Sequence, residues 1–360
     1  MRERLSDEIK MKKLICIFLA FTSFMFGCSI NSGLAMGNIS LVEEKAATQE
    51  VWATLVNETN NVSESVIVGC WDPTYWSGTG APGHHDDFIK WGLRIKTAHP
   101  QFFTSINSSG DLIKPGRQDE KHQGTYSIDY QELIRATKEI SDNNLLPTIG
   151  LFIHNFETVT GSALEKFFAK FSADLKKNRI SKVVLIPAWD IQGEWPAWEE
   201  GATRDCYIDS TIFNKQMWKI KRARDNANAD NIDLGIALAA GFDNKYLNKE
   251  RESGQDYLEG LRACDIVGIN YYPTKEKGPF AAFEDARKLW SALEGQKPVA
   301  FFEYSIETYD WINKKNIEWT NKDKIKFIKD SYKLLEEYPF VTQIHWWFIG
   351  KGSGARINYE

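Results

Sequence analysis

The segment Lys182–Ala188 reads KVVLIPA, and its central residues Val183–Ile186 are aliphatic without a polar residue among them. A strand with one face in water alternates apolar and polar side chains, whereas a strand covered on both faces is apolar throughout. The segment therefore predicts a strand of a parallel sheet that is buried on both faces.

Similar apolar runs recur along the chain and alternate with segments whose apolar residues are three and four positions apart, as in amphipathic helices. Eight such repeats match the (β/α)8 or TIM barrel, an α/β fold that typically takes about 250 residues. A doubly wound sheet shows the same alternation, but no G-x-G-x-x-G or G-x-x-x-x-G-K-[ST] motif follows the first run, which removes its usual nucleotide-binding versions. The predicted strands are Val66–Cys70, Gln101–Ile106, Leu146–Ile153, Lys182–Ala188, Ile232–Ala240, Asp265–Asn270, Pro298–Phe302 and Thr342–Phe348, and the predicted helices are Tyr130–Asn143, Ala163–Lys177, Ile212–Asn226, Ala281–Leu293 and Lys322–Glu337.

Composition narrows the range of partners. The net charge is −5 and no dense Lys/Arg cluster occurs, which argues against a nucleic-acid partner. Cys70, Cys206 and Cys264 have no C-x-x-C spacing, so we expect no metal site. We also expect no cofactor and a monomer. Phe, Trp and Tyr make up 13% of the chain, with 13 Trp, which fits either a bulky core or flat rings that stack on sugars.

The N-terminal residues resemble an export signal. Met11-Lys12-Lys13 is basic, and the apolar run Leu14–Phe26 is too short for a membrane span. The run ends in Met25-Phe26-Gly27-Cys28, which resembles a bacterial lipobox and predicts Cys28 as a lipidated residue on the membrane of the cell envelope. Ordinary secretion, with Cys28 incidental, is the alternative. We predict a signal peptide over 1–28, a polar tether over 29–65 and the barrel domain over 66–360.

The stretch after the eighth run is short. Gly350–Glu360 leaves little room for the helix that would follow the last barrel strand. Either the sequence stops early, or the segment ahead of the first strand covers the last groove of the barrel.

Active sites of (β/α)8 barrels lie at the C-terminal ends of the strands, so polar residues that end apolar runs are candidates. Asp190 and Glu194 follow the fourth run and Glu303 ends the seventh. A carboxylate there is costly unless it has a partner or a purpose. Two that face each other suit glycoside hydrolysis, with a separation of about 5–5.5 Å in retaining enzymes. The alternatives are an ion pair at the rim for Glu303, and a helix cap for Asp190 or Glu194.

These segments resemble those of glycoside hydrolase family 26, a β-mannanase family. The run PAWDIQGEW, residues 187–195, is similar to the family's strand-four motif, in which Arg-Pro-Phe-His-Glu-Met-Asn-Gly precedes an acidic or small residue and then Trp. In that register Asp190 takes the place of the acid/base Glu. KPVAFFEYS, residues 297–305, is similar to the nucleophile segment and implies Glu303 as nucleophile. DIVGINYY, residues 265–272, matches the segment whose final Tyr orients the nucleophile, which implies Tyr272.

Two residues depart from the family pattern. Asp190 is one methylene shorter than Glu, so its carboxyl would lie about 1.5 Å back, and a misplacement of about 1 Å can cost about a hundredfold in rate. Trp189 replaces the family's His, which we expect to remove a polar partner near both carboxylates. Either Asp190 still acts from a shifted backbone, or Glu194 takes over, or the protein binds glycan without cleaving it. We choose Asp190, because a strand end is more rigid than a loop.

Aromatic and polar residues after strand ends are the expected substrate contacts, although Trp71 or Trp346 alone could equally be a core residue. The resemblance implies that a Trp of the eighth strand lies beneath the attacked sugar. The sequence thus predicts a retaining endo-β-glycosidase of mannan-like polysaccharide, and the alternative is a weak or inactive barrel that binds surface or capsular polysaccharide. The expected contacts are Trp71, Trp195, Tyr272, Trp346, Trp347, His154 and Asn155.

Overall fold

In the computed structural model of the chain, contacts divide the protein into the compact units Met1–Ala46 and Ala47–Glu360. The structure describes residues 50–71, 94–99, 103–106, 109–111, 130–153, 156–189, 209–239, 254–306, 309–310 and 315–347, all in the second unit. The predicted signal segment and Cys28 lie outside these residues. Among the described helices, none is long and apolar enough to cross a membrane.

Parallel strands pair around a ring, as the alternation predicts. β1 pairs with β11 on one side and β2 on the other, and the further pairing of β2 with β4 closes the sheet. From β4 the order runs through β5, β6, β7 and β8 back to β11. β3 pairs with the second half of β4, so β2 and β3 share the place of the second barrel strand. The predicted (β/α)8 barrel is confirmed. The strands are β1 (Ile67–Trp71), β2 (Thr97–His99), β3 (Phe103–Ile106), β4 (Leu146–Ile153), β5 (Val183–Ile186), β6 (Ile232–Ala239), β7 (Ile266–Tyr271), β8 (Val299–Tyr304) and β11 (Val341–Trp347).

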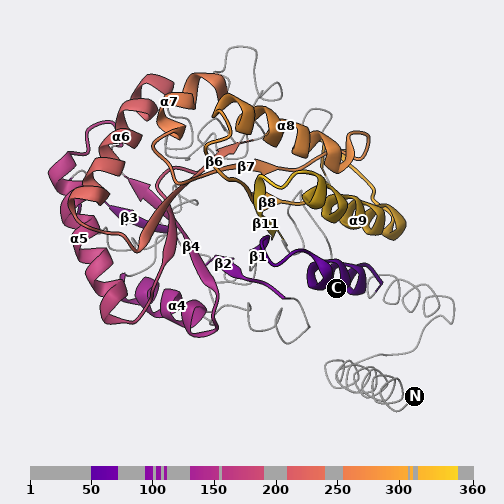
Figure 1. Ribbon diagram of the computed structural model, residues 1–360, viewed down its shortest axis with the longest axis horizontal. Coiled ribbons are helices and arrows are strands. Elements are labelled where there is room, and N and C mark those ends of the chain that lie inside the picture. The colour runs from indigo at the N-terminus through magenta and orange to yellow at the C-terminus, as the bar shows by residue number, and fades with distance from the viewer. Residues whose placement is uncertain are drawn as a thin grey trace, which may run out of the picture. The chain divides into compact units, whose positions relative to one another are not determined.

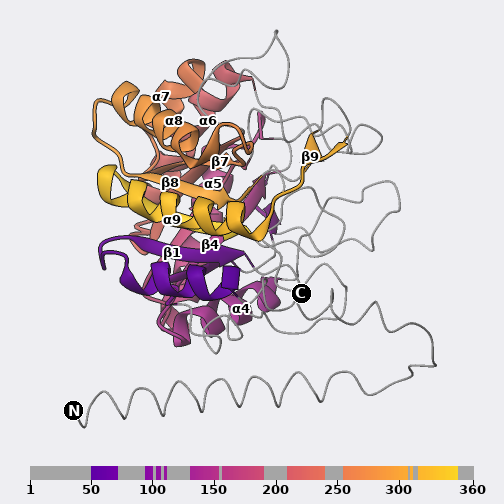
Figure 2. The ribbon, with the colours of Figure 1, turned by 90° about the vertical axis from the view of Figure 1, so that its right-hand side faces the viewer.

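Helices cover the outside of the ring (Figures 1 and 2). All five predicted helices are present, as α4 (Tyr130–Asp142), α5 (Gly161–Lys177), α6 (Ser210–Asn226), α8 (Gly278–Ala292) and α9 (Asn321–Glu337). The short 3-10 turn Gly254–Tyr257 and α7 (Leu258–Leu261) were not predicted, because four residues are too few to show a helical period. β9 (Tyr309–Asp310) and β10 (Lys315–Asn316) form a small antiparallel pair between β8 and α9.

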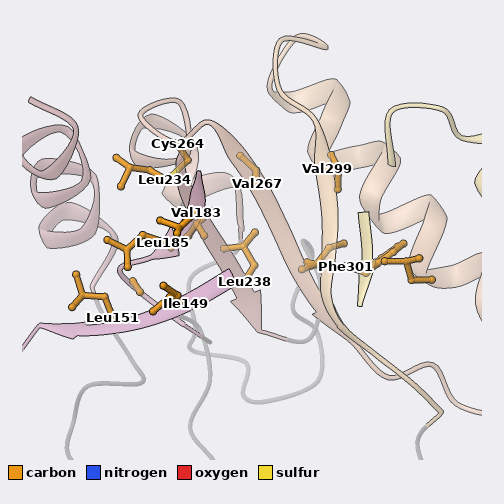
Figure 3. Packing of buried hydrophobic residues seen from close by; sticks show 14 of the residues in the cluster. Ile149, Leu151, Val183, Leu185, Leu234, Leu238, Cys264, Val267, Val299 and Phe301 are labelled. Atoms are coloured by element: carbon orange, nitrogen blue, oxygen red, sulfur yellow. The ribbon is translucent and has the colours of Figure 1, made fainter. Parts of the chain in front are cut away.

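The ring sends alternate side chains into two apolar layers. On β5, Val183 and Leu185 belong to the layer between strands and helices, whereas Val184 and Ile186 belong to the layer inside the ring. Figure 3 shows the outer layer, in which Val183 and Leu185 lie near Leu234 of β6. All of these side chains are 0% exposed, which confirms the predicted burial of β5 on both faces. Each such burial stabilises the fold by about 1.5–3 kcal/mol.

Residues 50–61 form a helix that packs on the barrel, which corrects the predicted tether over 29–65. Val51 and Leu55 are 1% and 0% exposed, and Thr59 Oγ1 shares a hydrogen bond of 2.5 Å with the Tyr332 hydroxyl of α9. That hydroxyl accepts a hydrogen bond of 3.0 Å from Trp346 Nε1 on β11. The helix lies beside β1 and α9 in both views (Figures 1 and 2). The N-terminal segment therefore covers the last groove of the barrel, which is one of the two alternatives that the short tail left open.

Candidate active site

Glu303 lies near the C-terminal end of β8 and is 5% exposed. Its Oε1 accepts a hydrogen bond of 2.8 Å from Trp189 Nε1, and its Oε2 accepts one from the Tyr272 hydroxyl. The structure therefore brings Tyr272 to Glu303, as the resemblance implies, and adds Trp189 as a second donor. Each carboxylate oxygen is held by a different side chain.

A bulge in β8 turns Glu303 into the barrel. Val299 and Phe301 pack in the layer next to the helices, so strict alternation would send Glu303 to the same side. The pairings of β8 with β7 and with β11 both shift by one residue after Phe301, so that two residues of β8, Phe302 and Glu303, lie opposite a single residue of each neighbour. Tyr304 consequently joins the outer layer and Glu303 faces the interior.

A second shift, after β5, brings Trp189 inside. Leu185 pairs with Leu234, but Trp189 bridges to Ala237, so the β5 side has one residue more than β6 over this stretch. Trp189 joins the inner layer, where its ring centroid lies 6.1 Å from that of Phe302. The two irregular strand ends thus place a donor and its acceptor on the same side of the sheet.

Glycine residues make room for the aromatic floor of the site. A Cβ atom on Gly268 of β7 would lie 2.2 Å from Phe302 Cδ2, and one on Gly235 of β6 would lie 3.3 Å from Phe302 Cζ. Any larger residue at Gly268 would push the Phe302 ring away. Close approach of β6 and β7 therefore holds the Phe302 ring, and Phe302 lies in the bulge that directs Glu303.

Both donors to Glu303 are uncharged, and the His345 ring packs nearby against Phe302. The Trp189 indole and the Tyr272 hydroxyl donate without carrying charge, and burial lowers the pKa of His345 to about 3, so its ring is neutral near neutral pH. The His345 ring packs edge-on against Phe302, with centroids 5.3 Å apart. Hydrogen bonds donated to a carboxylate favour its ionised form, which is the form that a nucleophile needs.

Trp346 does not lie at a sugar-binding rim, and this prediction is corrected. Its side chain is 0% exposed and packs edge-on against Tyr304, stacks on Tyr332 and contacts Phe327. These partners belong to β8 and α9, so Trp346 is a core residue on the helix side of β11. The alternative reading of Trp346 as a core residue is confirmed.

The other predicted residues are only partly within the described chain. The backbones of Trp71 and Trp347 pair in register at the ends of β1 and β11, while their side chains lie outside the description. The remaining predicted residues lie outside the described chain; they are Asp190, Glu194, Trp195, His154 and Asn155. The assignment of Asp190 as acid/base therefore stays a prediction.

Trp189 is the functional residue that sequence reasoning missed. The replacement of the family's His by Trp189 was expected to remove a polar partner from the site, but the indole N–H supplies one. The available signal was chemical: Trp carries a donor that needs an acceptor when buried, and Trp189 comes directly before a candidate acid. Within the described chain, no group of three or more His, Cys, Asp or Glu could hold a metal ion.

No protein-family model and no curated protein sequence matches the chain. Its structure is similar to that of mannanase man26 of Bacillus subtilis, with 18% identity, a TM-score of 0.49, and coverage of 84% of this chain and 85% of that chain. The GH26 β-mannanase BoMan26A of Bacteroides ovatus matches with 13% identity, a TM-score of 0.46 and 87% of both chains. A GH113 β-1,4-mannanase matches with 10% identity, a TM-score of 0.42, and 79% and 87% of the two chains. The three proteins named here are described as mannanases, and at these identities the likeness is one of fold.

Proposed function

We propose that the chain is a glycoside hydrolase that cleaves a mannan-like β-linked polysaccharide with retention of anomeric configuration, with Glu303 as nucleophile. The observation that carries this proposal is the buried Glu303 carboxylate at the C-terminal end of a barrel strand, with a neutral donor on each oxygen. Both donors orient the carboxylate without themselves carrying a charge, which suits a nucleophile. The C-terminal strand ends are also where such barrels carry their chemistry.

The reaction has two half-reactions. In the first, an oxygen of Glu303 attacks the anomeric carbon, the bond from that carbon to the glycosidic oxygen breaks, and the leaving oxygen takes a proton from the acid residue. In the second, water attacks the anomeric carbon and gives a proton to the same residue, now ionised. As the new bond forms, the bond to Glu303 breaks and its electron pair returns to the carboxylate. One water molecule is consumed, and both carboxyl groups are restored.

Asp190 is the proposed acid/base. It follows Trp189 directly in the sequence. The Trp189 indole is hydrogen-bonded to Glu303, and the Trp189 backbone forms a β-bridge to Ala237 of β6. We choose Asp190 over Glu194, four residues further along, because it directly follows this fixed residue and an acid catalyst needs a rigid support. Asp190→Ala should lower the rate of polysaccharide cleavage far more than the rate of cleavage of an activated aryl glycoside, because the aryl leaving group needs no proton. If Glu194→Ala shows that difference instead, the acid is Glu194.

β-Mannan is the first substrate to test, because the motifs resemble family 26 and similar structures are β-mannanases. Trp71, Trp195 and Trp347 are the proposed stacking residues. Proton NMR of mannohexaose hydrolysis should show the β-anomer of the product first, before it equilibrates in solution. The α-anomer first would contradict a nucleophilic Glu303. Binding without cleavage, over a panel of β-mannans and β-glucans, would favour the alternative of a barrel that only binds surface polysaccharide.

We also propose that the chain is exported and anchored in the cell envelope through a lipid at Cys28. The support is the basic start, the short apolar run Leu14–Phe26 and the Cys that ends it. Residues 29–49 would then connect the anchor to the helix at residues 50–61, with which the barrel domain begins. Such a place would give the enzyme access to polysaccharide outside the cytoplasm.

A further inference from the structure

Trp189 stands where the family motif has His, and its indole contacts the proposed nucleophile directly. The donor on Glu303 Oε1 is this indole, whereas the donor on Oε2 is the Tyr272 hydroxyl. We infer that Trp189 is a positioning residue that sets the balance between the two half-reactions by stabilising the Glu303 carboxylate as a leaving group. The inference rests on the proposed function.

The reason lies in the chemistry of the indole N–H. It donates one hydrogen bond, accepts none and carries no charge. A hydrogen bond to an ionised acceptor is roughly twice as strong as one to a neutral acceptor. Trp189 therefore stabilises the free Glu303 carboxylate more than the glycosyl ester that forms on it.

This preference has opposite effects on the two half-reactions. In the first, Glu303 loses its negative charge as it attacks the anomeric carbon, so the donor weakens the nucleophile. In the second, water displaces Glu303 and the charge returns to the carboxylate, so the donor makes Glu303 a better leaving group. Without the donor, formation of the ester should speed up slightly and its hydrolysis should slow.

The position of the donor is fixed. Trp189 is 7% exposed, its ring packs against Phe302, and its backbone bridges to Ala237. An indole enclosed in this way can turn its N–H little, so the bond to Glu303 is preorganised before substrate binds. A His at this position could gain a charge at acidic pH, whereas Trp189 offers the same donor at every pH.

The sharpest test removes the N–H and keeps the ring. Site-specific incorporation of 3-benzothienylalanine at Trp189 replaces the N–H by sulfur. On 2,4-dinitrophenyl β-mannobioside, whose leaving group makes ester formation fast, kcat should fall about tenfold. KM should fall in proportion, kcat/KM should stay within about twofold, and the burst of dinitrophenol should grow. Trp189→Phe should behave alike, and Trp189→His, which restores a ring donor, should recover part of kcat.

Val184→Ala is the matched control. It removes buried methyl groups from the same inner layer but keeps both the indole and the Phe302 ring that packs on it, so thermal stability should fall while KM should not fall in proportion to kcat. If the benzothienyl variant lowers kcat/KM about tenfold and shows no larger burst, Trp189 is a packing residue and the inference is wrong.

A second measurement needs no substrate. The infrared difference between each protein and its Glu303→Gln counterpart reports ionisation of this carboxyl alone, and loss of the donor should raise its titration midpoint by about one pH unit. An unchanged titration midpoint in an active enzyme would overturn this inference but leave the proposed function standing. A raised midpoint in a protein that cleaves no glycoside would overturn the proposed function, and the inference with it.

Discussion

Glu303→Gln should separate folding from chemistry at this site. The substitution keeps the shape of the side chain, and the partners of Glu303 select one orientation of the amide. Trp189 Nε1 can only donate, so the amide oxygen must take the place of Oε1, 2.8 Å away. The amide NH2 then faces Tyr272, whose hydroxyl oxygen can accept. Since both contacts persist, the free energy of unfolding should change by less than about 1 kcal/mol.

The activity should respond very differently. An amide cannot serve as the nucleophile, and removal of a nucleophile from a catalytic group typically costs on the order of 10⁴- to 10⁶-fold in kcat. We expect that loss on mannohexaose, with the dissociation constant measured by calorimetry unchanged within about threefold, because the shape of the site is kept. Turnover within about tenfold of the wild type would refute Glu303 as nucleophile.

Glu303→Ala is the matched control for stability. It removes the acceptor of a buried indole and of the Tyr272 hydroxyl, and loss of one partner of a buried polar group costs about 1–3 kcal/mol. For a domain of this size that corresponds to a melting temperature lower by about 2–6 °C. If Glu303→Gln were as unstable as Glu303→Ala, the charge of Glu303 would be structural, and the reasoning from neutral donors would fail.

Three further outcomes follow from the structure. Leu55 is 0% exposed, so Leu55→Ala should lower the free energy of unfolding by about 3 kcal/mol and the melting temperature by about 5 °C. Asn57→Ala, on the exposed face of the same helix, should change neither. Equal melting curves for the two variants would exclude the docked helix. The pKa of Asp323 is lowered to about 2, first by Lys275 and then by Thr320. This folded-state pKa is below the unfolded value of about 3.9. The contribution of Asp323 to folding stability is therefore complete above about pH 4 and is lost as the pH falls towards 2. Asp323→Asn should thus lower the melting temperature slightly at pH 7 and leave it nearly unchanged at pH 2. Cys28→Ser should release the protein from membranes or block its processing, and partition with membranes after normal cleavage would refute the lipid anchor.

Local apolarity predicted most strands of the barrel, and it missed β2, whose inward residue is polar. β2 was missed because Thr97 points into the ring, where its hydroxyl donates to the Leu146 carbonyl at 2.6 Å and lies 3.0 Å from Thr148 Oγ1. Thr97 is 0% exposed although its side chain is polar. The hydrogen-bond partners of such a residue are distant in sequence, and a local sequence pattern cannot show them.

The helix at residues 50–61 was missed for a related reason. Its inward stripe is narrow, with Val51, Leu55 and Thr59 one turn apart, and Thr59 is polar. The stripe is sufficient because Tyr332 supplies a buried hydroxyl opposite Thr59. Trp346 was misassigned because a strand end alone does not tell which face its aromatic side chain takes.

The direction of the site residues shows the same limit most sharply. Counted by strict alternation from Leu185 and from Phe301, both Trp189 and Glu303 would face the helices. One extra residue after β5 and one in β8 reverse both directions, and only the two shifts together create the hydrogen bond between indole and carboxylate. Periodicity could not supply this result. The position of Glu303 at the end of an apolar run made it a candidate, and the resemblance to family 26 implied its role, but neither showed the bulge that turns it inward. Trp189 departs from the family motif, and its contact with Glu303 follows only from the strand pairing.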